Sequence, residues 1–77
     1  MITVRYFAAA AEAAGVDQEP AAAGPGAAVR AGLLARHPAL TPILGRCALL
    51  ADGRRLADDD DVPAGATLDV LPPFAGG

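Results

Sequence analysis

Apolar and polar side chains alternate at both ends of this chain. Residues 2–7 (ITVRYF) and residues 67–71 (TLDVL) follow a period of two, which is typical of strands that bury one face. The strongest helix pattern, residues 27–38 (AAVRAGLLARHP), lies between them and closes at Pro38. Because parallel strands need a crossover connection, usually a helix, we expect the first and last strands to lie side by side and parallel.

The segments between the first strand and the main helix give weaker signals. Residues 8–15 (AAAAEAAG) favour a helix of a turn or two that ends at Gly15. Residues 16–21 predict a second strand, which Pro20 restricts to an edge of the sheet. Residues 24–26 (GPG) are expected to form a loop.

The second half of the chain predicts a return to strands. Residues 39–45 (ALTPILG) indicate a connecting turn whose leucine and isoleucine side chains reach the core. A strand over residues 46–51 (RCALLA) comes next, and Asp52-Gly53 is a strong signal for a hairpin that returns over residues 54–56. Residues 58–65 (DDDDVPAG) are expected to be a solvated loop.

A sheet built from an opening hairpin, one crossing helix and later strands is the β-grasp arrangement, an α+β fold with a mixed sheet. We expect a β-grasp domain over residues 1–71 and an extended tail over residues 72–77. A chain of 77 residues buries only about 60% of the surface that it exposes when unfolded, so its core must be simple. The large side chains available to fill that core are Ile2, Val4, Tyr6, Phe7, Val29, Leu33, Leu34, Leu40, Ile43, Leu44, Leu49, Leu50, Leu56, Val62, Leu68, Val70 and Leu71.

The charge balance argues against nucleic acid as a partner. The net charge is -3, and the six basic residues, all arginines, form no stripe that would follow a phosphate backbone. We expect instead a basic surface on another protein, with Asp58–Asp61 as the acidic patch that faces it. This run lacks the spaced ligands of a calcium loop. The sequence shows no signal peptide and no apolar run long enough to span a bilayer, so we expect a soluble, cytoplasmic protein without membrane contact.

Reactive side chains are scarce. The sequence has no serine, lysine, asparagine or tryptophan, one histidine (His37) and one cysteine (Cys47). A serine–histidine pair, a Schiff-base lysine, a zinc cluster and a disulfide framework therefore all lack parts. We expect Cys47 to be a small buried hydrophobe rather than a sulfur relay, and His37 to be a surface or capping residue.

The chain finishes on a segment with distinct mechanical properties, residues 72–77 (PPFAGG). Pro72 and Pro73 favour an extended path, which lowers the entropy lost on docking. Phe74 is suited to fill a partner's pocket, although in a chain short of aromatics it could pack on its own core. Glycine adopts any backbone angle and has no Cβ, so such an end can enter a narrow channel. Fully extended, the segment would reach about 20 Å from the domain.

These segments together resemble a known family. The opening ITVRYFAAAAEAAG, the middle ARHPAL, the hairpin LLADG and above all the end LDVLPPFAGG are similar to the MoaD/ThiS family of ubiquitin-like sulfur carriers, and most similar to its members that act as small subunits of molybdopterin synthase. The resemblance covers nearly the whole chain and is weakest over residues 17–28.

The resemblance implies a specific chemistry. Family members have their C-terminal glycine adenylated with ATP by an E1-like adenylyltransferase and then converted to a thiocarboxylate by a sulfur donor protein. The loaded tail enters the large subunit of molybdopterin synthase and passes sulfur to a cyclic pterin precursor. On this basis Gly77 carries the sulfur, and Pro72, Pro73, Phe74, Ala75 and Gly76 contact the partner. No cofactor is expected on the chain, which is a carrier rather than a catalyst by itself.

Other functions remain compatible with these residues. The same tail chemistry serves thiamin thiazole or cysteine synthesis, and the Pro-Pro-Phe sequence favours molybdopterin among them. A protein modifier would join Gly77 to lysines of other proteins. A plain binding module would carry an inert tail.

Overall fold

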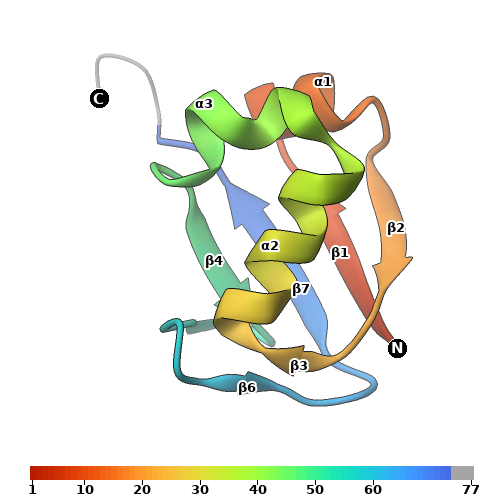
Figure 1. The fold of residues 1–77 in the computed structure, drawn as a ribbon, viewed down its shortest axis with the longest axis vertical. Helices are drawn as coiled ribbons and strands as arrows, with labels where there is room; N and C mark the ends of the chain where they lie inside the picture. Colours follow the sequence, from red (N-terminus) through yellow and green to blue (C-terminus); the bar gives the residue numbers. More distant parts are fainter. Residues whose placement is uncertain (74–77) are drawn as a thin grey trace.

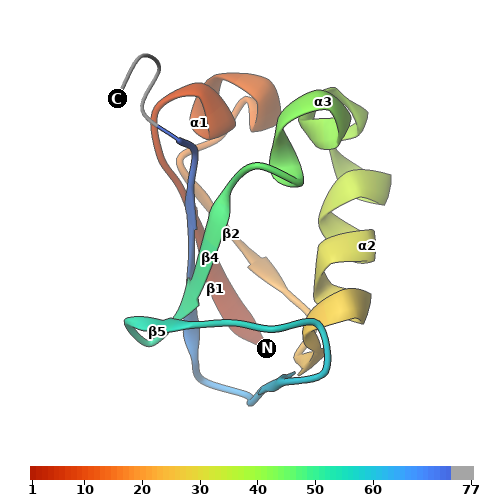
Figure 2. The ribbon, with the colours of Figure 1, turned by 90° about the vertical axis from the view of Figure 1, so that its left-hand side faces the viewer.

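The computed structural model describes residues 1–73 of the chain. A five-stranded sheet has the order β2-β1-β7-β4-β5, and helices cover one of its faces (Figures 1 and 2). The strands of this sheet are β1 (Ile2–Tyr6), β2 (Gln18–Ala21), β4 (Ala48–Ala51), β5 (Arg54–Arg55) and β7 (Thr67–Leu71). The helices are α1 (Ala9–Ala14), α2 (Gly26–Arg36), the 3-10 turn Pro38–Leu40 and α3 (Thr41–Leu44).

The first and last strands form the centre of the sheet. β1 and β7 run parallel, with Val4 opposite Leu68 and Tyr6 opposite Val70, which confirms the predicted pairing. β4 pairs with β7 on its other side, and β2 pairs with β1. β7 is therefore hydrogen-bonded along both edges. The fold is the expected β-grasp arrangement, with β2 at the sheet edge.

The core lies between the sheet and α2. The inward positions of β1 and β7 are buried because alternation turns every second side chain toward the helix. Val29 and Leu33 cover them from α2. Leu40 and Leu44 of the connecting turn are also fully buried, as predicted. Within residues 1–73, none of the helices is long and apolar enough to cross a membrane.

Several local predictions are confirmed. α1 ends at Gly15, whose φ of 76° is the left-handed geometry that glycine adopts at helix ends. The hairpin turn lies at Asp52 and Gly53, which have φ values of 49° and 82°. Positive φ at both central residues is the pattern of the turn that matches strand twist.

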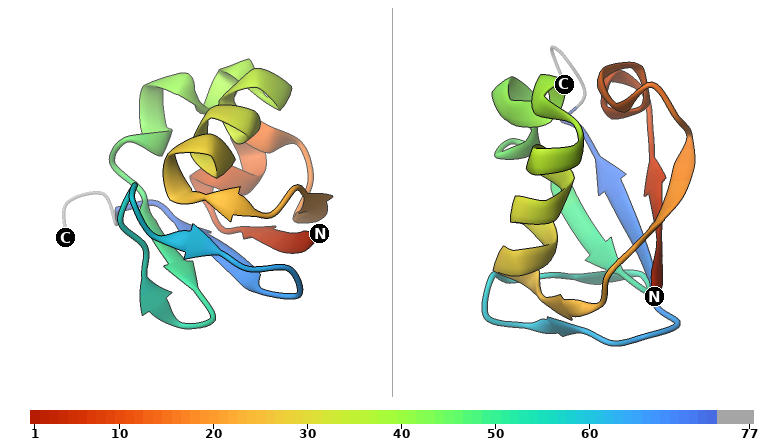
Figure 3. Two further views of the ribbon diagram at one scale, coloured as in Figure 1. Left: turned by 60° about the horizontal axis from the view of Figure 1, so that its bottom comes forward. Right: turned by 45° about the vertical axis from the view of Figure 1, so that its right-hand side comes forward.

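Two segments expected to be loops pair with each other instead. β3 (Gly24–Pro25) and β6 (Asp61–Val62) form a two-stranded ladder beneath the start of α2 (Figure 3). Val62 is buried, so the acidic segment is not wholly solvated. The main-chain oxygens of Asp60 and Asp58 accept the N–H groups of Gly26 and Ala27. The acidic segment thus satisfies the first amides of α2, which have no partner within the helix.

Phe7 was predicted to help fill the core, but the structure places it outside. Its side chain is 39% exposed, because it follows Tyr6 in the alternation and lies on the opposite side of the sheet. Ala8, the next residue, has φ 50° and ψ -125°, a conformation that costs non-glycine residues about 1–3 kcal/mol. The chain turns sharply there into α1, and Phe7 stays outside.

A cluster of polar side chains centred on Glu19 connects β1, β2 and the end of α2. Tyr6 donates its hydroxyl to Glu19 Oε2 at 2.6 Å, and His37 Nε2 lies 2.6 Å from the same oxygen. Arg36 Nη1 is 3.4 Å from Glu19 Oε1 and donates to the Pro20 carbonyl at 2.8 Å. His37 is the C-cap residue of α2. The prediction of a surface or capping residue is therefore confirmed. The His37 side chain is only 16% exposed.

The environment of Glu19 shifts its ionisation. Burial alone would raise the pKa of Glu19, but the hydrogen bonds from Tyr6 and His37 outweigh burial and hold it below its usual value of about 4.5. A carboxyl whose pKa is lower in the folded state contributes stability at higher pH. That contribution is complete above the unfolded-state pKa and is lost as pH falls through the folded-state pKa.

We predict that Glu19→Gln will destabilise the protein at pH 7 by about 1–3 kcal/mol, because charge-assisted hydrogen bonds are lost. Acidification from pH 6 toward pH 3 should then destabilise the native protein more than the variant. Urea unfolding across this pH range measures both effects. Glu12→Gln, which changes the exposed glutamate of α1, is the control. Parallel pH curves for the native and Glu19→Gln proteins would contradict the assignment.

Gly26 supplies a test of the contact between α2 and the acidic segment. A Cβ at Gly26 would lie 2.6 Å from the Ala57 carbonyl oxygen, whereas a Cβ at Gly32 in the same helix meets nothing within 4 Å. Gly26→Ala should destabilise by about 1–3 kcal/mol through overpacking. Gly32→Ala should stabilise by about 0.5–1 kcal/mol, because alanine favours helix. Equal urea midpoints for the two variants would contradict the close approach of Gly26 to the Ala57 carbonyl.

Candidate functional site

The candidate site is the point where β7 ends and the terminal segment begins. Leu71 is the last residue of β7, and Pro72 and Pro73 follow it outside any strand. Pro72 is half-buried and Pro73 is exposed. We call residues 71–73 the tail root. The other predicted contact residues and the predicted sulfur-bearing residue lie outside the described residues, namely Phe74, Ala75, Gly76 and Gly77.

The sheet holds the tail root from both sides. Ala48 of β4 lies opposite Leu71, and Phe7 donates its N–H to the Val70 carbonyl at 3.2 Å. A strand paired on both edges can move only if two ladders open, so the root is among the best-anchored points of the fold. The position of the tail root is therefore fixed by the sheet.

The sheet face turned away from α2, here called the outer face, carries side chains next to the tail root. It presents Arg5 and Phe7 from β1 and its end, Asp69 and Leu71 from β7, and Leu50 from β4. Leu50 and Leu71 are half-buried although no helix covers them. This surface combines apolar side chains with one ion pair.

That ion pair is fixed by geometry. Arg5 Nε and Nη2 donate to the two oxygens of Asp69 at 2.6 and 2.9 Å, a bidentate arrangement that orients the guanidinium. The hydrogen bonds that Arg5 donates to Asp69 raise the pKa of Arg5. Arg5 Cζ also lies 5.6 Å from the centre of the Phe7 ring, within the range of a cation–π contact. Asp69 thereby holds Arg5 against the exposed ring of Phe7.

Sequence reasoning missed this group. Arg5 and Asp69 occupy the same outward step of two alternating strands and are direct partners in the parallel ladder. Opposite charges at outward positions of two strands predicted to be neighbours were the available signal. Using it required the register, which alternation alone does not give.

Cys47 lies beside the tail root on the inner side of the sheet. It immediately precedes β4, is 8% exposed and belongs to the core. Its thiol donates to the Ile43 carbonyl at 3.3 Å, and burial raises its pKa. The expectation of a small buried hydrophobe is confirmed.

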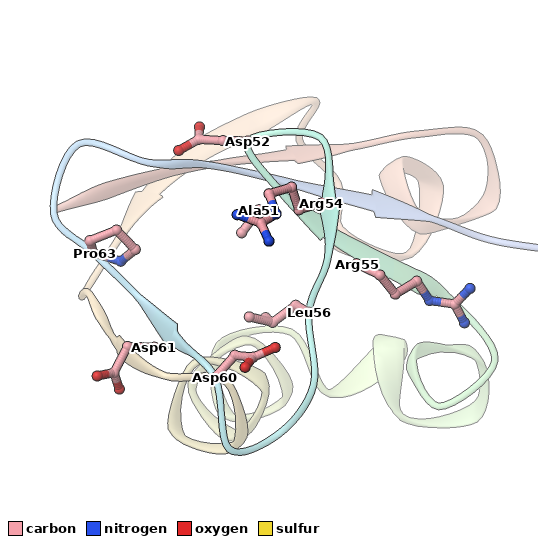
Figure 4. A pocket seen from close by; sticks show the side chains of 8 residues that line it. All are labelled: Ala51, Asp52, Arg54, Arg55, Leu56, Asp60, Asp61 and Pro63. Atoms are coloured by element: carbon pink, nitrogen blue, oxygen red, sulfur yellow. The ribbon is translucent and has the colours of Figure 1, made fainter.

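A cavity at the other end of the sheet is unsuited to act on the tail. It has a volume of about 350 Å³ and is lined by side chains from the β4–β5 hairpin and the acidic segment (Figure 4). Asp52 at its rim accepts the N–H of Thr67, the first residue of β7, whereas the tail starts at the last. Asp58 of the acidic run pairs with Arg30 at 3.4 Å. Among residues 1–73, no group of three histidine, cysteine, aspartate or glutamate side chains is placed to hold a metal ion.

Known proteins match this chain over almost its full length. The ThiS family model matches residues 4–77. The molybdopterin synthase sulfur carrier subunit of Chlamydomonas reinhardtii is 35% identical over 99% of this chain and 98% of its own length.

Solved structures share the fold. SAMP1 from Haloferax volcanii is 25% identical, with a TM-score of 0.82 over 99% of this chain and 98% of that one. A putative molybdopterin converting factor, subunit 1, from Pyrococcus furiosus is 21% identical, with a TM-score of 0.82 over 95% of this chain and 97% of that one. By the family match over residues 4–77 and the relative matched end to end, the chain belongs to the MoaD/ThiS family of ubiquitin-like sulfur carriers.

Proposed function

We propose that this protein carries sulfur as a thiocarboxylate on Gly77 and serves as the small subunit of molybdopterin synthase. The observation that carries the proposal is the central strand β7, which is paired on both edges and continues into Pro72 and Pro73. The 35% identical relative that is named as a molybdopterin synthase sulfur carrier subunit supports the choice of pathway.

The chemistry explains why the reactive atom must lie far from the domain. A carboxylate is a poor electrophile, so an E1-like adenylyltransferase first joins it to AMP, with release of pyrophosphate from ATP. A sulfur donor protein then attacks the acyl carbon, the bond to AMP breaks, and a thiocarboxylate remains. Both steps need the carboxyl carbon of Gly77 inside another protein's site. Gly76 and Gly77 have no side chains, so they can enter a narrow channel.

The tail root and outer face support docking to the synthase large subunit and the activating enzyme. A fixed root reduces the conformational entropy that the tail loses on insertion. Phe7 and Leu71 lie around the origin of the tail, so a partner that surrounds the tail must cover them. Phe7 is an exposed aromatic residue beside Arg5, and aromatic residues and arginine are enriched at protein interfaces.

Intact mass provides the direct test of sulfur loading. We expect incubation with an E1-like adenylyltransferase, ATP and a sulfur donor to replace one oxygen of the native chain by sulfur, while a chain lacking Gly77 stays unchanged. Adding the large synthase subunit and the pterin precursor should return the carboxylate and yield product. An unloaded native chain, or equal loading of the shortened chain, would rule out the carrier function.

Phe7 tests the docking surface. Phe7→Ala should weaken binding to the large subunit by about tenfold or more, because a buried aromatic hot spot contributes about 2 kcal/mol. Val16→Ala is the matched control, since Val16 is 40% exposed against 39% for Phe7 and lies in the loop before β2. Isothermal titration measures both affinities. Equal losses for the two variants would exclude the outer face from the interface.

A second candidate function is protein modification. It is favoured by the likeness to SAMP1 of Haloferax volcanii, which belongs to a group described as small archaeal modifier proteins. In that function the activated Gly77 would form an amide with a lysine of another protein. Tagged chain recovered from cell extract should then carry isopeptide adducts that disappear when Gly77 is deleted.

A further inference from the structure

Once Gly77 is activated, the chain's own nucleophilic side chains can compete with those of other molecules for its acyl carbon. Continuing the Ala48–Leu71 register by one residue places Cys47 opposite Pro72. The single thiol of the sequence, which lies between α3 and β4 along the chain, is therefore at the tail root. Residues 72–77 can span about 20 Å when extended, so their length is sufficient to fold back to this position.

Capture by that thiol would divert the carrier. The thiolate of Cys47 would attack the acyl carbon, a carbon–sulfur bond would form, AMP would leave, and the thiol proton would pass to solvent. The product is a closed thioester ring with no free end to load. Thiols react as thiolates, so exposure and pKa determine how fast this happens.

The fold opposes each requirement of that reaction. Cys47 shares the inward parity of Leu49, so its thiol points toward α3 and the core rather than toward the outer face. The thiol donates its hydrogen to the Ile43 carbonyl, and burial raises its pKa. Pro72 and Pro73 restrict the backbone angles of the chain next to the root.

The other nucleophilic side chains are also occupied. The sequence contains no lysine or serine. Tyr6 donates its hydroxyl to Glu19, and burial together with that bond raises its pKa. His37 Nε2 is held by the same carboxylate. The cysteine, tyrosine and histidine side chains among residues 1–73 are therefore each buried or bonded to a neighbour.

We propose that the inward burial of Cys47 at the tail root protects the activated C-terminus from capture by the chain's own thiol. This inference extends the proposed function. Its test uses a chemically prepared acyl group and no activating enzyme, so either hypothesis can fail while the other stands.

The test starts from the chain produced with a mercaptoethanesulfonate thioester on Gly77. Internal capture releases the small thiol and lowers the intact mass, and low protein concentration suppresses exchange between chains. We expect the folded chain to cyclise at least about tenfold more slowly at pH 7 than the same chain in urea, where Cys47 is exposed. Cys47→Ala should abolish cyclisation in both solvents.

A displaced thiol separates burial from stiffness of the tail. Arg46→Cys combined with Cys47→Ala moves the thiol by one residue to an exposed position, where substitution is expected to leave folding intact. This variant, shown to be folded by circular dichroism, should cyclise in the absence of urea. Rapid cyclisation of the native folded chain would overturn the proposal. So would an inert displaced thiol, because the stiff prolines rather than burial would then protect the acyl carbon.

Discussion

The parallel pairing of β1 with β7 is the constraint on which the rest of the structure depends. Parallel neighbours cannot be joined by a tight turn, so the chain must cross one face of the sheet between them, and α2 makes that crossing. The crossing helix supplies Val29 and Leu33 to the core. It also leaves the opposite face of the sheet open and puts the last strand in the middle.

Much of this architecture could be predicted from the sequence, because the signals are local. The period of two in residues 2–7 and 67–71, the left-handed Gly15 and the Asp52-Gly53 turn each depend on a few neighbouring residues. The parallel pairing of the first and last strands followed from connection rules rather than from any single residue. These rules act on the chain regardless of its particular side chains.

The features that were missed depend on contacts between distant segments. The β3–β6 ladder is only two residues long on each side and contains Gly24 and Pro25, which disfavour strands in isolation. Glu19 meets Tyr6 and His37 only after α2 has folded onto the sheet. Phe7 was counted among the large side chains available to the core, although its place in the alternation put it on the outer face. Roles for Phe74 to Gly77 stay predictions.

The bond from Arg36 to the Pro20 carbonyl has a consequence for self-association. The main-chain N–H groups of Thr3 and Phe7 point toward β7. Thr3 and Pro20 lie opposite each other but therefore share no main-chain hydrogen bond. The main-chain polar groups of Pro20 consequently face the free edge of β2. Proline has no N–H to donate at this edge, and the Pro20 carbonyl already accepts a hydrogen bond from Arg36. The opposite edge, β5, is only two residues long. The sheet thus resists extension by another strand, which protects a protein of this size from aggregation through its edges.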